Sequence, residues 1–317
     1  MSYDKKADTV VPDIEAMLQE LIDGKDIEIT DEKLVKFGSD IALTLKRALT
    51  ARKKGSRKHK VLYMSEYGRP CRRQLWYELR EEYHTDKEQL KPANIVKFLY
   101  GDILEEIVLL LAELSGHTVE DQQRGVEINL PNGWLLRGRI DAIIDGEVVD
   151  VKSTTTHGFK KFKEDKLHED DPFGYIPQLA GYGEGIYGED IKDGQSCSFL
   201  AIDKQLGNIV RMPIYAEVPD DEETIERRHN ELEQHRIELV EDMEATAPPE
   251  RAFDATPDGK SGNMKLRTSC SYCPFKHECW KESNDGAGLR TFIYSTGPRY
   301  LTEVAKTPNV PEKESEK

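Results

Sequence analysis

Four of the five cysteines in this chain have a spacing that suits metal binding. Cys270, Cys273 and Cys279 form a C-x2-C-x5-C motif near the C-terminus, whereas Cys71 lies far upstream of them. Thiolates are soft ligands that suit zinc ions and iron–sulfur clusters. The three clustered cysteines are one ligand short of four, and Cys71 can supply the missing one. A metal bound in this way would join the two ends of the segment between these cysteines.

His277 leaves a second interpretation of the motif open. It lies between Cys273 and Cys279, so it could complete a local zinc site of the Cys3His type together with Cys270. Cys71 would then be an unrelated buried thiol. The fifth cysteine, Cys197, precedes an apolar run and is expected to be a small buried residue.

A second group of residues that could do chemistry lies at 139–152, in the sequence RIDAIIDGEVVDVK. The Asp-Gly pair at 145–146, between two β-branched runs, is the strongest short-range signal for a β-hairpin. A two-residue turn at this pair would place Asp141 opposite Asp150. Lys152 would follow two residues later on the same face of the strand.

Two like charges directly opposite one another destabilise a sheet, unless water or a cation screens them. We expect Ile143 and Val148 on the face of the two aspartates. The other face is expected to hold Ile140, Ala142, Ile144, Val149 and Val151. Because both faces are partly apolar, a cation between the carboxylates would relieve the repulsion, and hard carboxylate ligands suit Mg²⁺ or Mn²⁺. An ordinary solvated sheet face is the alternative.

The hydrophobic pattern predicts the elements that must position these residues. Helices are expected over 13–23, 31–52, 73–82, 94–115, 175–187 and 220–245. Strands are expected over 117–129, 134–144, 147–153, 195–203 and 208–214. This mixture predicts an α/β fold with a mixed β-sheet core flanked by helices.

The composition is that of a polar chain of 317 residues, of which 33% are charged, with a net charge of −15. The absence of an 18-residue apolar run argues against a membrane protein, and the N-terminus lacks the apolar stretch of a signal peptide. We therefore expect a cytoplasmic protein, in which reduced, clustered thiols favour a metal over disulfides.

The charge is unevenly distributed along the chain. Residues 46–60 hold eight Lys or Arg and no acid, whereas 217–250 is strongly acidic. We expect the basic stretch to contact DNA phosphates, although a solvated helix end running into a linker is the alternative. The residues assigned to this contact are Arg52, Lys53 and Lys54, with Arg69, Arg72, Arg73 and Arg80 extending the basic region. Trp76, Tyr77 and Tyr100 could stack on bases, but core packing explains each of them as well.

Asp141 followed by Asp150-Val151-Lys152 resembles the signature of the PD-(D/E)XK nuclease superfamily. Gln178 and Tyr182 match the Q-x3-Y motif of its RecB-type branch. Upstream, where that branch usually has G-x3-H, this chain has Gly101 and a glutamate in place of the histidine. The glutamate is Glu105, and the adjacent Glu106 is an alternative ligand.

The cysteine pattern resembles the iron–sulfur subgroup of that branch, which includes AddB-type nucleases, CRISPR-associated adaptation nucleases and phage exonucleases. The resemblance covers about residues 62–281. It implies a restriction-endonuclease-like fold with a C-terminal iron–sulfur region, in which a [4Fe–4S] cluster is bound by Cys71, Cys270, Cys273 and Cys279. Structural Zn²⁺ is the alternative. If the chain is phage-encoded, its location would be the host cytoplasm.

The resemblance also implies roles for the residues of the hairpin and the two motifs around it. Mg²⁺ or Mn²⁺ would be held by Glu105, Asp141, Asp150 and the backbone carbonyl of Val151. Lys152 would orient the attacking water and stabilise the charge of the transition state. Gln178 and Tyr182 would position the DNA strand.

We therefore expect a metal-dependent DNA exonuclease that hydrolyses phosphodiester bonds from DNA ends, preferably single-stranded ones. Replication, repair or recombination would be its setting, and proteins of these processes its partners. A DNA endonuclease is one alternative, and a non-catalytic nucleic-acid-binding or assembly module stabilised by a metal cluster is another. The opposed carboxylates and the lysine favour the enzyme.

Four segments are expected along the chain. A helical region with the basic stretch spans 1–60, and the nuclease core spans 61–215. A helix and the cysteine region that closes onto Cys71 span 216–285, followed by a tail over 286–317 whose end is expected to be disordered.

Overall fold

The computed structural model describes residues 3–50, 59–84, 87–88, 91–188, 197–214 and 222–313, and side chains within 222–244 only from Glu233 onward. The chain forms two compact units, each built from two stretches of sequence. Unit 1 comprises Met1–Gly68 and Lys91–Ile237, and unit 2 comprises Arg69–Leu90 and Glu238–Lys317. The hairpin at 139–152 thus belongs to unit 1, and the four cysteines of the metal motif belong to unit 2.

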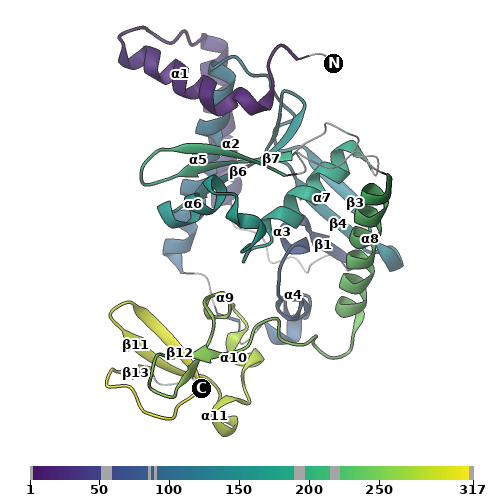
Figure 1. The fold of residues 1–317 in the computed structure, drawn as a ribbon, viewed down its shortest axis with the longest axis vertical. Helices are drawn as coiled ribbons and strands as arrows, with labels where there is room; N and C mark the ends of the chain where they lie inside the picture. Colours follow the sequence, from purple (N-terminus) through teal and green to yellow (C-terminus); the bar gives the residue numbers. More distant parts are fainter. Residues whose placement is uncertain are drawn as a thin grey trace. The chain divides into compact units, whose positions relative to one another are not determined.

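Unit 1 is a mixed structure of strands and helices (Figure 1). Its helices are α1 (Val10–Ile22), α2 (Asp31–Leu49), α3 (Met64–Tyr67), α5 (Pro92–Leu114), α6 (Thr156–Lys163), α7 (Tyr175–Tyr187) and the part of α8 (Glu222–Glu244) up to Ile237. Short 3-10 turns lie at Ala7–Thr9, Pro131–Gly133 and Lys166–His168. Its strands are β1 (Val61–Tyr63), β2 (Val119–Glu120), β3 (Gly125–Asn129), β4 (Leu135–Arg139), β5 (Ala142–Ile144), β6 (Glu147–Thr154), β7 (Cys197–Asp203) and β8 (Ile209–Ile214).

The strands of unit 1 form two sheets, ordered β2-β5-β6-β7-β8 and β1-β4-β3. In the larger sheet β6 and β7 run parallel, whereas the other neighbours are antiparallel. Parallel neighbours need a long crossover, and the connection from β6 to β7 contains both α6 and α7. The predicted mixed sheet with flanking helices is therefore confirmed for this unit.

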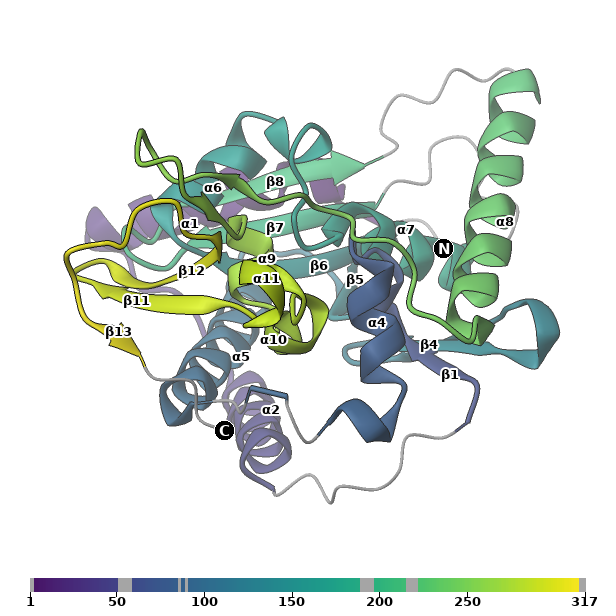
Figure 2. The ribbon, with the colours of Figure 1, turned by 90° about the horizontal axis from the view of Figure 1, so that it is seen from below.

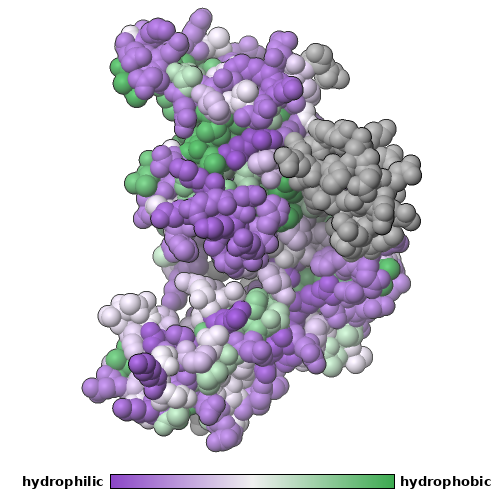
Figure 3. Space-filling model, viewed as in Figure 1, coloured by the Kyte–Doolittle hydropathy of each residue, from purple (hydrophilic) through white to green (hydrophobic). Residues whose placement is uncertain are grey.

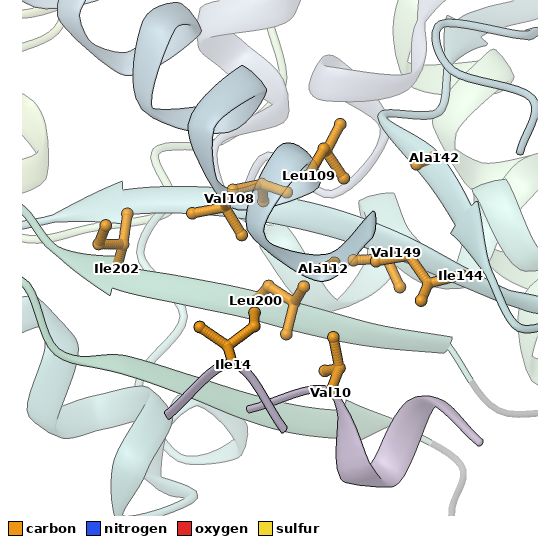
Figure 4. Close-up of a cluster of buried hydrophobic side chains, with 11 residues drawn as sticks. Val10, Ile14, Val108, Leu109, Ala112, Ala142, Ile144, Val149, Leu200 and Ile202 are labelled. Carbon is orange, nitrogen blue, oxygen red and sulfur yellow. The ribbon is translucent and has the colours of Figure 1, made fainter. Parts of the chain in front are cut away.

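One face of the larger sheet is buried under α1 and α5 (Figure 4). Pro92 lies in the first turn of α5, where its missing N–H costs no hydrogen bond, and the helix continues through a long apolar run. The buried cluster consists of Val10, Ile14, Val108, Leu109, Ala112, Ala142, Ile144, Val149, Val151, Leu200 and Ile202. Because side chains alternate along a strand, this burial directs Asp150 and Lys152 of β6 to the opposite face. Helix α2 packs beside α5 (Figures 1 and 2).

The structure confirms most predicted elements and divides two of them. The predicted strand at 117–129 is interrupted by a loop in which Asp121 and Gln123 have positive φ, so that β2 and β3 are separate. The predicted strand at 134–144 bends at Asp141, and its two halves, β4 and β5, belong to different sheets. Helix α6 was not predicted, although Thr155 caps it by accepting a hydrogen bond from the Gly158 N–H.

Unit 2 contains a sheet of its own, ordered β13-β11-β12-β10-β9 (Figure 2). Its strands are β9 (Thr256–Pro257), β10 (Met264–Lys265), β11 (Arg290–Tyr294), β12 (Gly297–Glu303) and β13 (Glu312–Lys313). Its helices are α4 (Arg72–Glu78), α9 (Thr268–Ser271), α10 (Lys276–Cys279), α11 (Ser283–Gly286), the end of α8 and a 3-10 turn at Glu81–Tyr83. The predicted tail at 286–317 thus contains three strands, because Phe292 and Leu301 are fully buried apolar residues of this sheet.

The face of the surface that Figure 3 shows is mostly hydrophilic, as the mean hydropathy of −0.66 leads us to expect. Among the helices in the described ranges, none is both long enough and apolar enough to cross a bilayer.

Candidate active site

The hairpin of β5 and β6 has the predicted turn and register. Asp145 (φ 48°) and Gly146 (φ 85°) both have positive φ, as a type I′ turn requires. The Asp145 carboxylate accepts a hydrogen bond from the Thr118 N–H at 2.9 Å and lies 2.6 Å from Nδ1 of His117, so the turn is fixed from outside. The strand pairs are the predicted ones, namely Ala142–Val149, Ile143–Val148 and Ile144–Glu147.

This register brings Asp141 beside β6. Asp141 lies one residue beyond the last pair, where the continuing register makes Asp150 its neighbour. Its Oδ2 accepts a hydrogen bond from the Val151 N–H at 2.8 Å. Asp150 is buried, and its Oδ2 lies 2.5 Å from Nζ of Lys152. The two aspartates and the lysine of the motif are therefore close together on one side of the sheet.

Helix α5 adds Glu105 to this group. A Cβ on Gly101 would lie 3.2 Å from Oγ of Ser153, so a glycine at this position lets the helix approach β6 beside Lys152. One turn later, Oε1 of Glu105 accepts a hydrogen bond from Nε2 of Gln123 at 2.9 Å. The backbone N–H of Gln123 in turn donates to the carbonyl of Asp141 at 3.2 Å. Gln123 thus connects Glu105 with Asp141.

Glu106, the alternative ligand, has a different neighbourhood. Its Oε1 accepts a hydrogen bond from Oγ1 of Thr44 on α2 at 2.9 Å. It also lines a small cleft between α2 and α5 with residues such as Lys36 and Asp40. Of the two glutamates, Glu105 is therefore the one placed to act with the aspartates.

The surroundings of the site disfavour the ionised forms of two of its carboxyl groups. Burial, followed by the charges of Asp141, Glu106 and Asp150, raises the pKa of Glu105 well above its usual value. Burial and the charge of Asp150 likewise raise the pKa of Asp141. Burial would lower the pKa of Lys152, but the charges of Asp150 and Asp141 outweigh it, so this pKa is raised and the lysine is a cation.

This electrostatic situation fits a hard divalent cation. Across the described ranges, no three His, Cys, Asp or Glu side chains converge closely enough to bind a metal ion as they stand. The donors of Glu105, Asp141 and Asp150 are nevertheless carboxylate oxygens, which Mg²⁺ and Mn²⁺ prefer. Their ionised forms repel one another, and burial disfavours them further, so a bound cation would stabilise the charged state.

Helix α7 brings Gln178 and Tyr182 to the same site. Nε2 of Gln178 lies 3.5 Å from the Tyr182 hydroxyl, the distance of a weak hydrogen bond. Burial, with further contributions from the charges of Asp150 and Asp141, raises the pKa of Tyr182 to about 12. A Cβ on Gly138 would lie 2.5 Å from the Tyr182 ring, so only glycine in β4 leaves room for this tyrosine.

Tyr175 and Gln123 were not singled out in the sequence. Tyr175 is the first residue of α7. Its ring lies 4.7 Å from Nζ of Lys152, which is a cation–π distance. An aromatic residue at the start of a helix has no pattern that separates it from a core residue. Gln123 lies in a loop with positive φ, where no periodicity could have identified it.

The four cysteines of the motif gather in unit 2, and none of them forms a disulfide. Cys71 precedes α4, Cys270 is in α9, Cys279 ends α10, and Cys273 lies between these two helices. Burial, then the charges of Cys71 and Cys279, raise the pKa of Cys270 to about 11. Burial also raises the pKa of Cys273 to about 12, with the other three thiols adding to the effect. Each thiol therefore lies within electrostatic reach of the others.

His277 occupies a different environment from the cysteines. Its ring packs edge-on against Tyr300, with 5.9 Å between ring centres. Burial lowers its pKa, and the charges that act on it are those of Lys276, Glu88 and Lys313. These contacts favour Cys71 over His277 as the fourth member of the thiol group.

Three arginines that were expected to extend the DNA-binding surface are bound within unit 2 instead. Arg72 pairs with Asp242 at 3.0 Å and with Glu238 at 3.3 Å. Arg73 donates to the carbonyl of Pro249 at 2.8 Å. Arg80 donates to the carbonyls of Met243 and Ala245, and its guanidinium lies 3.6 Å from the Trp76 ring. These contacts stabilise the end of α8 against α4.

The aromatic residues proposed for base stacking differ in exposure. Trp76 and Tyr77 are each only 2% exposed and form part of the core of unit 2, so the core interpretation holds for both. Tyr100 is 47% exposed, and its hydroxyl donates to the carbonyl of Lys204 at 3.3 Å. Arg52, Lys53 and Lys54, which were assigned to phosphate contact, lie outside the described residues.

Comparisons with known proteins identify the family. A family model described as the PD-(D/E)XK nuclease superfamily matches residues 34–280. Among solved structures, the crystal structure of SSO0001 is similar at 16% sequence identity, with a TM-score of 0.42 over 74% of this chain and 93% of that chain. A search of curated proteins returned no match.

The family match spans most of the chain, and it includes the hairpin with Asp141, Asp150 and Lys152, the helix with Glu105 and all four cysteines of the thiol group. This chain therefore belongs to the PD-(D/E)XK nuclease superfamily.

Proposed function

We propose that this protein is a Mg²⁺- or Mn²⁺-dependent DNA exonuclease that degrades DNA, preferably single-stranded, from its ends. The observation that carries the proposal is the group formed by the buried Asp150 on β6 and the partly buried Asp141, just before β5, and Glu105 on α5, beside the cationic Lys152. A structural role explains this group poorly, because burial and mutual repulsion disfavour the ionised forms of Glu105 and Asp141. The same observation argues against a non-catalytic binding or assembly module.

In this proposal Glu105, Asp141, Asp150 and the carbonyl of Val151 hold the divalent cation. When bound, the cation supplies an activated water and neutralises charge that develops on the phosphate. One oxygen of Asp141 accepts a hydrogen bond from the Val151 N–H, and one oxygen of Glu105 accepts one from Gln123, and the carboxylates would move closer together to bind the cation. Lys152 keeps its proton and stabilises the negative charge of the transition state. Gln178 and Tyr182 position the DNA strand beside these groups.

The cysteines support a more specific assignment to the RecB-type iron–sulfur branch. The charges of the other thiols contribute to the raised pKa values of Cys270 and Cys273, which supports a shared site, although Cys71 is separated from the others in sequence by most of unit 1. A [4Fe–4S] cluster uses four thiolates of this kind. Burial raises the pKa of Cys279, and Arg251 and Arg73 oppose this increase with charges that favour the thiolate, the form that binds a metal. We propose that this cluster has a structural role, with zinc as the alternative metal.

Hydrolysis of end-labelled DNA tests the proposed activity directly. The labelled DNA should be degraded in the presence of Mg²⁺ or Mn²⁺ and should remain intact in EDTA. DNA that survives both conditions, although the protein binds it, would support the non-catalytic module instead.

The choice between exonuclease and endonuclease predicts a difference between two substrates of the same sequence. We expect linear single-stranded DNA to be degraded much faster than covalently closed circular single-stranded DNA. The sequence contains no recognisable motif that contacts base edges, so the site should accept a strand of any sequence that enters it by a free end. The measurement is the initial rate of nucleotide release from each. Equal rates would replace the exonuclease by an endonuclease and would leave the metal-dependent chemistry in place.

The basic stretch predicts a salt effect on DNA binding. Neutralising Arg52, Lys53 and Lys54 together should weaken the binding of DNA. For single-stranded DNA, the slope of log K against log salt concentration should also become less steep, by up to ~0.7 for each phosphate contact that is lost. Titrations of labelled DNA at several salt concentrations, without divalent metal, give both values. Lys25→Gln, which removes an exposed lysine elsewhere in unit 1, should leave the slope unchanged. If the triple variant keeps the wild-type slope, the stretch is only a solvated linker.

A further inference from the structure

An exposed aromatic side chain lies next to the catalytic lysine and has no role in the proposed chemistry. Phe173 is 61% exposed, and its ring stacks on that of Tyr175, with 5.3 Å between ring centres and 30° between ring planes. The Tyr175 ring lies 4.7 Å from Nζ of Lys152. Together these two distances place the Phe173 ring no more than about 10 Å from the lysine Nζ.

The two rings continue inward to a third one. Phe162 of α6 is buried, and its ring lies 6.4 Å from that of Tyr175 at an angle of only 28°. Three rings, each tilted by about 30° against its neighbour, thus form a series from the core beside β7 to the solvent. The outermost ring, that of Phe173, presents aromatic surface on which another flat ring could stack.

Hydrogen bonds and close packing fix the main chain on both sides of Phe173. The Asp171 carboxylate accepts hydrogen bonds from the N–H groups of Phe173 at 3.3 Å and Ile176 at 2.9 Å. Gly174, the next residue, has a φ of 72°, and a Cβ there would lie 1.8 Å from the carbonyl oxygen of Gly68. The main chain at Gly174 is therefore packed tightly against the main chain at Gly68. A side chain that is ordered before binding loses less conformational entropy when a ligand stacks on it.

We infer that Phe173 is a base-stacking residue, which binds the face of a nucleobase of the substrate strand close to the scissile phosphate. The inference rests on the proposed function, because Lys152 marks where that phosphate would lie. A distance of about 10 Å corresponds to roughly three stacked nucleotides at ~3.4 Å each, so the base belongs to one of the first nucleotides beside the phosphate. Every base has an aromatic face, so this contact binds DNA of any sequence.

Single abasic nucleotides locate such a contact. The probe is a labelled oligo-dT strand in which one abasic nucleotide replaces each position in turn, and binding to the full-length protein is measured by fluorescence anisotropy in EDTA. At one or two positions, the missing base should weaken binding by wild-type protein roughly 5- to 150-fold, the range for one base–aromatic stack. Phe173→Ala should lose about the same factor on intact oligo-dT and should show no further loss at these positions.

Two variants control for indirect effects. Phe173→Trp keeps an aromatic surface and should retain both the affinity and the abasic effect. Leu206→Ala removes an equally exposed apolar side chain, 66% exposed, from the turn between β7 and β8 of the same unit and should bind like wild-type protein. The inference is overturned if Phe173→Ala shows the same abasic profile as wild-type protein.

The outcome remains separable from that of the proposed function. If the wild-type protein hydrolyses DNA with Mg²⁺, but Phe173→Ala has the same abasic profile as wild-type protein, the stacking role alone is excluded. If Phe173→Ala changes the abasic profile, but the wild-type protein hydrolyses no DNA with Mg²⁺ or Mn²⁺, the nuclease activity alone is excluded and the base contact is retained.

Discussion

Asp150→Ala and Lys152→Ala should each lower the rate of Mg²⁺-dependent DNA hydrolysis by at least ~10²–10³-fold, the cost typical of removing one preorganised electrostatic group from an active site. Asp150 is the buried carboxylate nearest to the lysine, with 2.5 Å between Oδ2 and Nζ. Without it the proposed metal site loses a ligand, and without Lys152 the site loses its cation for the transition state. Initial rates on end-labelled single-stranded DNA measure both effects.

These substitutions also alter folding, and the double variant separates the two effects. Removal of Asp150 leaves Lys152 as a largely buried cation whose nearest carboxylate is gone, which is destabilising. Asp150→Ala/Lys152→Ala removes both charges, so its melting temperature should recover towards the wild-type value while its activity stays lost. Lys160→Ala, an exposed position on α6, should keep full activity. Full activity in either single variant, with a mock purification as blank, would exclude the hairpin from the mechanism.

Protein purified without oxygen should be brown and contain about four iron atoms per chain, the content of one [4Fe–4S] cluster. Cys71→Ala should lower the iron content to below about one per chain and should destabilise unit 2, because metal binding is coupled to folding. Cys71 precedes α4, whereas its three partners lie beyond residue 268, so the cluster would join the two stretches of this unit. Metal analysis and thermal unfolding check both effects.

Two other variants provide the controls for this experiment. Cys197→Ala removes a fully buried thiol from β7 of unit 1 and should leave the iron content unchanged. His277→Ala should also retain iron, because its ring packs against Tyr300. One zinc ion per chain, retained in Cys71→Ala and lost in His277→Ala, would establish the local Cys3His site instead.

The hairpin could be predicted in detail because its signals are local. A two-residue Asp-Gly turn permits only one register, and the register decides which side chains share a face. Ala142, Ile144, Val149 and Val151 accordingly form part of the core under α5, as predicted. The geometry of Asp141 could not be obtained in this way, because the ladder ends at Ala142 and its carboxylate binds the Val151 N–H.

The rest of the site depends on contacts between segments that are distant in sequence. Gln123 binds Glu105, and Tyr175 contacts Lys152, yet neither residue lies in a motif. The contacts of Arg72, Arg73 and Arg80 within unit 2 could not be predicted for the same reason, because a run of arginines predicts charge and not the carbonyls and carboxylates that surround it. The sheet of unit 2 was missed because several of its strands are very short and their order follows from long-range pairing.

The two-stretch construction of unit 2 has a consequence for how the chain is made in the cell. Ribosomes add about 5–20 residues per second, so Cys71 is synthesised roughly 10–40 s before Cys270. Most of unit 1 is encoded between them, and its sheet can therefore form before unit 2 has all of its parts. Delivery of the proposed cluster to the thiols would then be a late step in biogenesis, after synthesis of most of unit 1. In an iron-starved cell, newly made chains would accumulate with a finished nuclease unit and an unfinished second unit.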